Sequence, residues 1–394
     1  MAPRATACSD GFRRSPDRIR CIEKANATAS QLASRFIDRK TRRRTGAEPS
    51  RQKGIQMEQL ARLAGLAVAL VTAFSPHLAR PAQAAEVRIV SGLGLCYLPM
   101  IIATENRLIE KHAAALGVPD VKVAYTQLTS GPAITDALIS GNADIAMAGT
   151  SVMLNLWDKT VKFAPVKGMM AICDSPIYFN TIDPAITSIK DFKPTDRIAM
   201  ASGKGTQHAL ILEMATAQAF GFDQRNKFET LAITMSHPDG VAALLSGGAG
   251  AKTHVTTVPF IQMELAKPGV RTVLNSYDVT GGPSTLITAY ANEKWRTENP
   301  KLYDATYAAL TEAMTLIAAD KTAAAQAFKR FDTSKLSVAE IVAILNDPNM
   351  MTFSPMPRKV MVFAQYMHKT GLLKNLPASW KDVFFSNVHD LPGD

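Results

Sequence analysis

The sequence predicts an α/β fold made of two similar lobes. Short apolar runs alternate with helical runs over most of residues 85–292, which is typical of strands joined by helices in α/β sheets. The segment "ALISGNADIAMAGTS" leads from a helix through a Gly turn into a short apolar strand, and "ALLSGGAGAKTHVTTV" repeats this plan. Residues 85–394 also exceed one ordinary hydrophobic core and suit two domains.

The basic character of the chain belongs to its first 84 residues. The net charge is +10, and residues 1–84 hold 16 Lys and Arg against 6 Asp and Glu, so residues 85–394 are neutral overall. Residues 1–56 have no apolar periodicity and are expected to be disordered, or to be an over-extension of a reading frame whose true start is Met57. The neutral remainder has no cluster of Lys and Arg with aromatic residues, so no nucleic-acid partner is expected.

Residues 57–84 have the pattern of a secretory signal peptide. Arg62 precedes an apolar core at residues 63–74, and Ala82-Gln83-Ala84 forms a small-x-small cleavage site. The core is shorter than the roughly 20 residues that a membrane span needs. We expect cleavage after Ala84 and export to the periplasm, because an organellar transit peptide and a twin-arginine signal fit the charges of the leader less well.

The apolar and helical runs predict the elements of the mature chain in order. Strands are expected at residues 87–91, 121–125, 143–148, 166–172, 197–201, 230–234, 254–258, 270–274 and 285–291. A helix is expected over 206–220, ending before Gly221, and another over 341–345, after the capping box from Ser337 to Glu340. Long helical runs follow at 301–320 and 359–369. The alternation favours parallel sheets.

Two segments, 168–182 and 281–292, have no flanking helices of their own lobe and are expected to cross between the lobes. Lobe one is then discontinuous, with residues 85–175 and 285–394. Lobe two, residues 176–284, is inserted into it. Paired crossings of this kind form a two-segment hinge with a cleft between the lobes.

The small turn Gly149-Thr150-Ser151, at the end of an apolar run, is the first candidate binding feature. Thr and Ser are good N-caps for the helix that follows, and the N–H groups of an open helix N-terminus suit an anion. A tight turn that is capped for stability alone is the alternative. "GLGLCY", residues 92–97, forms a Gly-rich turn after the first strand, and Thr206 begins another helix.

Catalytic motifs are missing from the sequence. It has no Gly-x-Ser-x-Gly elbow, no His-Glu-x-x-His, no P-loop and no Gly-x-Gly-x-x-Gly, so neither an enzyme nor a cofactor is expected. His237, Asp239, His254 and His208 are of metal-ligating types. Helix capping and ordinary half-buried histidines explain them better, so no metal is expected.

The mature chain contains two of the four Cys residues, Cys96 and Cys173. Two Cys are too few for a disulfide framework, and they lack the spacing of a metal site. We therefore expect two partly buried thiols rather than a bridge.

Five segments in this order carry a family resemblance: "GLGLCYLPMIIATENRLIEKHAAALG", "ALISGNADIAMAG", "HPDGVAALLSG", "YDVTGGPSTL" and "ASWKDVFFSNVHDLPG". Over residues 85–394 the chain resembles the periplasmic substrate-binding proteins of ABC importers, in the nitrate/sulfonate/taurine branch. The resemblance implies a type II periplasmic-binding-protein fold, in which two lobes close on a small polar or anionic solute that is then passed to an ABC permease. It also implies a monomer without a cofactor.

The resemblance also places ligand contacts by position. In lobe one they are Gly94, Cys96, Tyr97, Thr129, Ser130, Gly149, Thr150 and Ser151. In lobe two they are Thr206, Gln207, His237, Asp239, His254 and Thr257. Thr150 and His254 are expected on opposite walls of the cleft, and His254 stands where sulfonate binders often carry an aromatic residue. The ligand, a sulfonate, nitrate, taurine or a similar solute, is left open.

Two other functions use the same fold. A periplasmic sensor subunit would hand a signal to a membrane kinase, and nothing in the sequence separates it from a transport protein. An enzyme or binder that resembles the thiamine-pyrimidine precursor proteins would stay in the cytosol and carry a reactive Cys cluster. The export signal and the two Cys residues disfavour that enzyme.

Overall fold

The first sheet takes its strands from the two parts of the chain that flank residues 175–284. The computed structural model describes residues 85–163, 165–201, 203–246, 250–331 and 335–394, which belong to one compact unit, Pro81–Asp394. The expected disordered leader, 1–56, and signal peptide, 57–84, lie outside the described residues. The sheet has the order β11-β4-β10-β3-β1-β2, with strands β1 (Glu86–Ser91), β2 (Lys122–Gln127), β3 (Ile145–Gly149), β4 (Val166–Asp174), β10 (Thr285–Asn292) and β11 (Thr352–Phe353).

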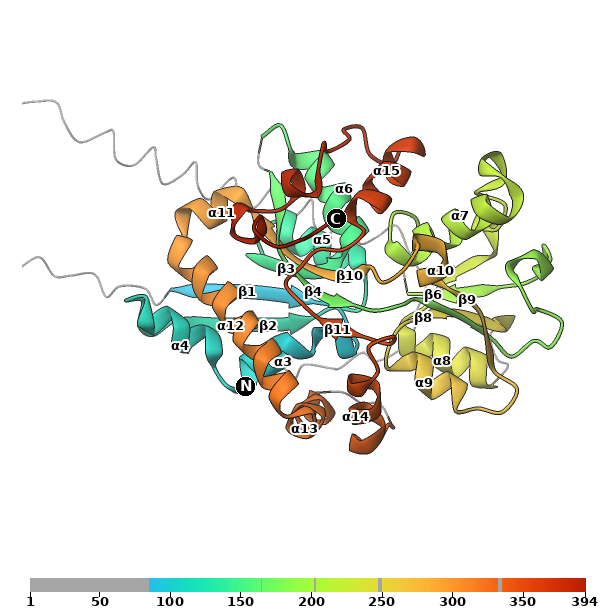
Figure 1. Cartoon of the computed structure of the whole chain (residues 1–394), viewed down its shortest axis with the longest axis horizontal. Helices are drawn as coiled ribbons and strands as arrows, with labels where there is room; N and C mark the ends of the chain where they lie inside the picture. The colour runs from blue at the N-terminus through green and yellow to red at the C-terminus, as the bar shows by residue number, and fades with distance from the viewer. Residues whose placement is uncertain (1–84, 164, 202, 247–249, 332–334) are drawn as a thin grey trace, which may run out of the picture. The chain divides into compact units, whose positions relative to one another are not determined.

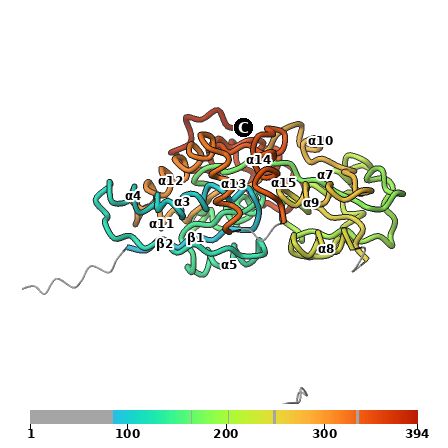
Figure 2. Tube along the Cα trace, turned by 90° about the horizontal axis from the view of Figure 1, so that it is seen from below, coloured from blue at the N-terminus to red at the C-terminus, as the bar shows by residue number. Residues whose placement is uncertain are grey.

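The second sheet is built from the middle of the chain and has the order β7-β6-β8-β5-β9. Its strands are β5 (Tyr178–Thr181), β6 (Ile198–Met200), β7 (Ala232–Thr234), β8 (Thr253–Thr256) and β9 (Arg271–Asn275). Figures 1 and 2 show the elements of the two sheets at opposite ends of this unit. We call the elements of the first sheet and their helices lobe one, and the elements from β5 to the helix before β10 lobe two.

The two sheets share one plan, which confirms the predicted pair of similar α/β lobes. In lobe one, β1 pairs in parallel with β2 and β3, and β10 runs antiparallel beside β3. In lobe two, β6 pairs in parallel with β7 and β8, and β5 runs antiparallel beside β8. The expectation of parallel sheets therefore holds for the strand pairs of β1 and β6 and is wrong for β5 and β10, which run antiparallel to their neighbours. The antiparallel strands β5 and β10 enter directly from the other lobe, so no crossover helix turns them into the parallel direction.

The helices follow the predicted runs closely. Lobe one contains α3 (Leu98–Glu105), α4 (Leu108–Ala115), α5 (Gly131–Ile139), α6 (Thr150–Thr160), α11 (Glu293–Glu298), α12 (Pro300–Ala319), α13 (Lys321–Phe331), α14 (Val338–Asn346) and α15 (Val360–Lys369). Lobe two contains α7 (Gln207–Phe220), α8 (His237–Ser246), α9 (Phe260–Leu265) and α10 (Ser276–Thr280). The capping box before α14 is present, because Ser337 and Glu340 each accept the other's main-chain N–H.

Apolar side chains fix these helices on the sheets. The α12 helix packs against α3 and α4, and α6 packs against β4 and β10. Tyr290 of β10 and Tyr303 of α12 are among the largest fully buried side chains. Burial of this kind contributes about 25 cal/mol per Å² of apolar surface, so the sheets and the strand ends that follow them are held rigidly.

Two short connections carry the chain between the sheets. Residues 175–177 join β4 to β5, and residues 281–284 join α10 to β10. They fall within the segments that were expected to cross. Thr285 at the start of β10 donates a hydrogen bond from Oγ1 to Asp174 Oδ1 at the end of β4, over 2.8 Å, so the two connections are tied together beside the first sheet.

Candidate functional site

A cavity lies between the lobes and is lined from both sides. Lobe one supplies the turn before α3, the start of α5, the end of β3 and the start of β10. Lobe two supplies the start of α7, the start of α8 and the residues after β8. The lining therefore gathers strand ends and helix N-termini, as the small-residue turns of the sequence predict.

The turn at residues 92–97 brings the lobes into contact. Gly94 has a φ of 125°, a conformation that L side chains rarely adopt. A Cβ at this position would lie 3.2 Å from Val258 O of lobe two. The next residue, Leu95, donates its main-chain N–H to the same carbonyl over 3.3 Å. Glycine is required here because the turn approaches the backbone of the other lobe.

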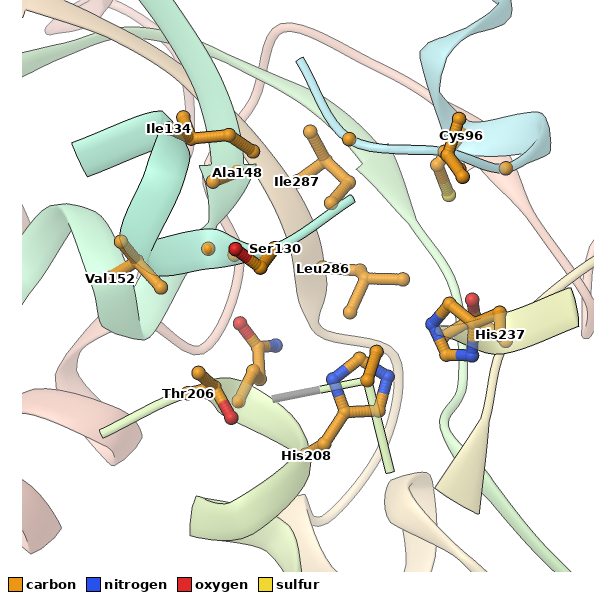
Figure 3. A pocket seen from close by; sticks show the side chains of 18 of the residues that line it. Cys96, Ser130, Ile134, Ala148, Val152, Thr206, His208, His237, Leu286 and Ile287 are labelled. Carbon is orange, nitrogen blue, oxygen red and sulfur yellow. The ribbon is translucent and has the colours of Figure 1, made fainter. Parts of the chain in front are cut away.

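The remaining wall of lobe one is largely apolar. Ser130 is the N-cap of α5 and accepts the N–H of Ala133 over 3.4 Å. Behind it, Figure 3 shows apolar side chains from α5, β3, α6 and β10 facing the cavity, namely Ile134, Ala148, Val152, Leu286 and Ile287. The lobe-one side thus offers an apolar surface with a small polar edge.

Gln207, the first residue of α7, is held in one orientation. Its Nε2 donates to Thr285 O over 3.0 Å, which ties lobe two to the start of β10. Its Oε1 is buried and has no hydrogen-bond partner among the residues that the structure describes. Turning the amide over would place an oxygen against the carbonyl of Thr285, so Oε1 is fixed as an acceptor.

Three histidines lie side by side in lobe two. The ring centroids of His208 and His237 are 5.2 Å apart, and those of His237 and His254 are 5.4 Å apart. His237 Nδ1 is 3.4 Å from His254 Nε2, and His254 Nδ1 hydrogen-bonds with Glu264 Oε1. Asn180 Nδ2 donates to the other carboxylate oxygen of Glu264 over 2.9 Å.

Burial keeps the two histidines of the cavity wall uncharged. It lowers the pKa of His208 to about 4, with a smaller contribution from His254. It also lowers the pKa of His237 well below the usual range, helped by the neighbouring His208 and His254. At neutral pH both imidazoles are therefore neutral hydrogen-bonding groups, since desolvation disfavours the charged form.

The cavity brings ten of the fourteen expected contact residues together. They are Gly94, Cys96, Tyr97, Thr129, Ser130, Gly149, Thr206, Gln207, His237 and Thr257. Asp239 lies instead in a neighbouring hollow that shares Thr129, Ser130 and Ala201 with the cavity, where it accepts a hydrogen bond from Ser236. Ligand binding by the ten residues that line the cavity stays a prediction.

Thr150, Ser151 and His254 are buried outside the cavity lining. The Thr150 hydroxyl donates to Thr285 O over 2.9 Å, and Ser151 Oγ donates to Gly205 O of lobe two over 3.4 Å. His254 stands behind His237. The expectation that Thr150 and His254 face each other across the cleft is therefore wrong. The start of α6 turns its hydroxyls toward main-chain carbonyls, and β8 turns His254 toward α9.

Cys96 and Cys173 form a disulfide, so the expectation of two thiols is wrong. Cys96 lies in the short 3-10 helix Leu95–Tyr97 and Cys173 near the end of β4, with their Cα atoms 5.4 Å apart. That separation lies in the usual range for a bridge. Their separation of 77 positions in the sequence hid this proximity, which arises because the turn before α3 packs on β4.

Several lining residues were not among the expected contacts. His208 follows Gln207 at the start of α7, and its place beside a helix N-terminus was the available signal. Val258, Leu286 and Ile287 line the cavity although the sequence marks them only as strand or core residues. A single apolar residue at a strand end carries no pattern that separates a cavity wall from a core position.

The described ranges contain neither a cluster of metal ligands nor a helix that could span a membrane. No group of three or more His, Cys, Asp or Glu side chains in these ranges has an arrangement that holds a metal ion. In the same ranges, every helix is too short or too polar to cross a bilayer. The side chains of the cavity lining offer hydrogen bonding and apolar contact.

A family model described as the NMT1-like family matches residues 81–331. None of the curated proteins matches the chain in sequence. Solved structures match it through the fold. The periplasmic aliphatic sulphonate binding protein SsuA from Escherichia coli is 17% identical with a TM-score of 0.57, and the match covers 78% of this chain and 99% of that chain.

Two further structures match over a similar extent. The alkanesulfonate-binding protein SsuA from Xanthomonas axonopodis pv. citri, bound to MOPS, is 17% identical with a TM-score of 0.59, over 75% of this chain and 96% of that chain. The periplasmic nitrate-binding protein NrtA from Synechocystis PCC 6803 is 16% identical with a TM-score of 0.58, over 76% of this chain and 84% of that chain. These matches confirm the periplasmic-binding-protein fold that the sequence resemblance implied.

Proposed function

The chain belongs to the NMT1-like family, and on this premise we propose that it is a substrate-binding protein that captures a small polar or anionic solute between its lobes and delivers it to an ABC permease. One observation carries the proposal: the walls of the cavity come from both lobes, and two short connections, 175–177 and 281–284, join the two sheets. A movement about these connections opens and closes the cavity around a solute.

The division into lobes follows the same connections. We propose that residues 85–175 and 285–394 move as lobe one and residues 176–284 as lobe two. Leu95, Ser151 and Gln207 each make a hydrogen bond from one lobe to the other around the cavity. In this arrangement the lobes are in contact, and release of a solute requires these bonds to break.

The ligand site that we propose consists of the ten expected residues that line the cavity, together with His208. Hydroxyls of Ser130 and Thr257, the amide of Gln207 and the imidazole of His237 surround one space. None of them is arranged as a nucleophile with an adjacent base and acid, so their chemistry suits binding without a chemical step.

Export is the second part of the proposal. The apolar core at residues 63–74 and the Ala82-Gln83-Ala84 site support cleavage after Ala84 and delivery to the periplasm. N-terminal sequencing of the protein secreted by its native host should give a start near Ala85. An exported form that keeps residues 1–56 would contradict the proposed processing.

A thermal-shift screen tests solute binding directly. The candidates are alkyl and aryl sulfonates, taurine, nitrate, bicarbonate, carboxylates and pyrimidines. A compound that binds only the folded protein stabilises it by about 2.7 kcal/mol when its concentration is 100 times its Kd. We expect at least one class to raise the melting temperature of the wild-type protein.

A matched pair of variants locates the binding. Thr129 is exposed at the cavity and Thr126 is exposed on the edge strand β2, away from it. Thr129→Trp should abolish the shift by filling the cavity, whereas Thr126→Trp should keep it. A shift that survives Thr129→Trp would place the binding site elsewhere, and the absence of any shift across the screen would count against a solute-binding protein.

A further inference from the structure

The residues that line the cavity carry no formal charge. No Lys, Arg, Asp or Glu is among the described residues of the lining. Of the two histidines of the wall, His237 is buried and His208 is half-buried, and both are neutral at neutral pH, as their lowered pKa values indicate. An anion that enters the cavity therefore meets no cationic side chain to offset the loss of its hydration.

Gln207 demands a particular partner. Its Nε2 is engaged by Thr285 O, and its Oε1 is a fixed acceptor, buried at the cavity with the whole residue only 3% exposed. Only a hydrogen-bond donor satisfies such an atom. Nitrate and deprotonated sulfonates present acceptor oxygens alone, so they leave Oε1 unpaired. His208 Nε2, also buried without a partner among the described residues, is a second neutral group in the same wall.

The opposite wall favours an apolar body on the ligand. Ile134, Val152, Leu286 and Ile287 face the cavity from lobe one (Figure 3). Contact with these side chains stabilises a hydrocarbon or ring in proportion to the area that it removes from water. The cavity thus has an apolar wall from lobe one, and on the lobe-two side it has an acceptor that requires a hydrogen-bond donor on the ligand.

We infer that the proposed binding protein takes an uncharged organic molecule with an apolar body and at least one N–H or O–H donor, and that Gln207 Oε1 accepts this donor. The inference rests on the proposed function and narrows its ligand class. It separates this chain from the sulphonate-binding and nitrate-binding proteins whose fold it shares.

Helix N-termini are the groups in this cavity that could stabilise a bound anion. The N-cap residues of α5, α6 and α7, namely Ser130, Gly149 and Thr206, line the cavity, and helix N-termini bind anions elsewhere. Binding of an anion at these helix N-termini leaves Gln207 Oε1 without a hydrogen bond. This alternative predicts that anions bind more tightly than neutral compounds. The two alternatives are therefore distinguished by compounds that differ in charge and donors but not in shape.

Isothermal titration calorimetry with matched pairs makes this comparison. The pairs are methanesulfonamide with methanesulfonate, benzenesulfonamide with benzenesulfonate, and propionamide with propionate, each titrated into the mature wild-type protein at neutral pH. We expect the neutral member of at least one pair to bind about tenfold or more tightly than its anion, since an unpaired buried acceptor costs a factor of this order.

Two variants assign the preference to one atom. Gln207→Met keeps the length of the side chain and removes the acceptor, so it should bring the neutral member to the affinity of its anion. Thr150→Val removes another hydrogen bond to the same carbonyl, Thr285 O, from a residue outside the lining, and should leave the preference unchanged. If a variant fails to fold, the affinities of the neutral and anionic compounds for the wild-type protein still test the inference.

Each result decides the inference. Equal or tighter binding of the anions overturns it, and the proposed solute-binding function then stands with an anionic ligand. A neutral preference that persists in Gln207→Met also overturns it, because another group then accepts the donor. If none of the six compounds binds, the inference about the ligand class is overturned as well. The wider thermal-shift screen then tests the proposed solute-binding function separately.

Discussion

Gly240 illustrates how one residue sets the geometry of the histidines. It lies inside helix α8, where glycine costs roughly 0.5–1 kcal/mol relative to alanine. A Cβ at this position would overlap the imidazole of His254. The missing side chain lets His254 stand against the helix, within reach of both His237 and Glu264.

Gly240→Ala should therefore destabilise the protein although it raises helix propensity. Forcing a methyl group against a buried ring costs about 1–3 kcal/mol, which exceeds the propensity gain. Urea unfolding measures the change, and Ala242→Gly at an exposed position of the same helix gives the propensity effect alone. In a His254→Ala background the penalty of Gly240→Ala should disappear. Stabilisation by Gly240→Ala in the wild-type background would show that the ring and the helix are not in contact.

The neutral state of His208 makes stability depend on pH. The pKa of His208 is lowered from 6.5 to about 4 in the folded chain, chiefly by burial. As the pH falls through this window the unfolded chain binds the proton first, so the free energy of unfolding decreases. The slope reaches about 1.4 kcal/mol per pH unit for a single group. Above this window His208 has no effect on the pH dependence.

His208→Gln should make the loss of stability on acidification smaller. Asp174, whose pKa burial raises from 3.8 to about 6, acts with the opposite sign, because the folded chain keeps its proton longer. Asp174 is present in both proteins, so its contribution cancels when the pH-dependent change in the free energy of unfolding of the variant is subtracted from that of the wild type. Urea unfolding of wild type and variant at about pH 7 and about pH 5 gives this difference. Equal losses in the two proteins would mean that His208 is charged in the folded state.

At the scale of elements, the disulfide joins a cavity turn to the strand that leads into lobe two. Cys96 lines the cavity in the turn before α3, and Cys173 is the second-last residue of β4, just before the connection at residues 175–177. The bridge therefore fixes the cavity turn to the part of lobe one that adjoins the crossing.

Replacing both cysteines by alanine should lower the free energy of unfolding by roughly 2–5 kcal/mol, because the unfolded chain is released from a long closed loop. Unfolding of the wild type with and without dithiothreitol should show the same decrease, and the reductant should have no effect on the double variant. Thiol titration of the unfolded, unreduced wild type should find no free thiol from this pair. Two reactive thiols would contradict the bridge.

Elements were predicted well where local pattern decides them, and poorly where distant segments meet. The run at 206–220 and the capping box at Ser337 gave helices with nearly correct ends, because caps and periodicity are local. The short strands β5 and β11 were missed, since they depend on pairing with β8 and β4. The same holds for the site: local pattern marked the Gly-rich turn at residues 92–97 and the helix start at Thr206, which line the cavity, whereas the inward turn of Thr150 was missed.

At the scale of the whole compact unit, hydrogen bonds across the cavity hold the lobes together. Leu95 N donates to Val258 O, Ser151 Oγ to Gly205 O, and Gln207 Nε2 to Thr285 O, over 3.3, 3.4 and 3.0 Å. Each contributes about 0.5–1.5 kcal/mol at most, so the contact between the lobes is weak enough for a ligand to shift its population. A solute that touches both lobes adds to these bonds only in the closed state.

Small-angle X-ray scattering of the mature protein, with and without a saturating compound from the thermal-shift screen, tests the central claim most directly. A protein that captures its solute between two moving lobes should show a smaller radius of gyration with the compound bound, and Thr129→Trp should abolish the decrease. An unchanged radius of gyration, at a concentration where calorimetry shows the site to be full, would contradict lobe closure and with it the proposed mode of capture.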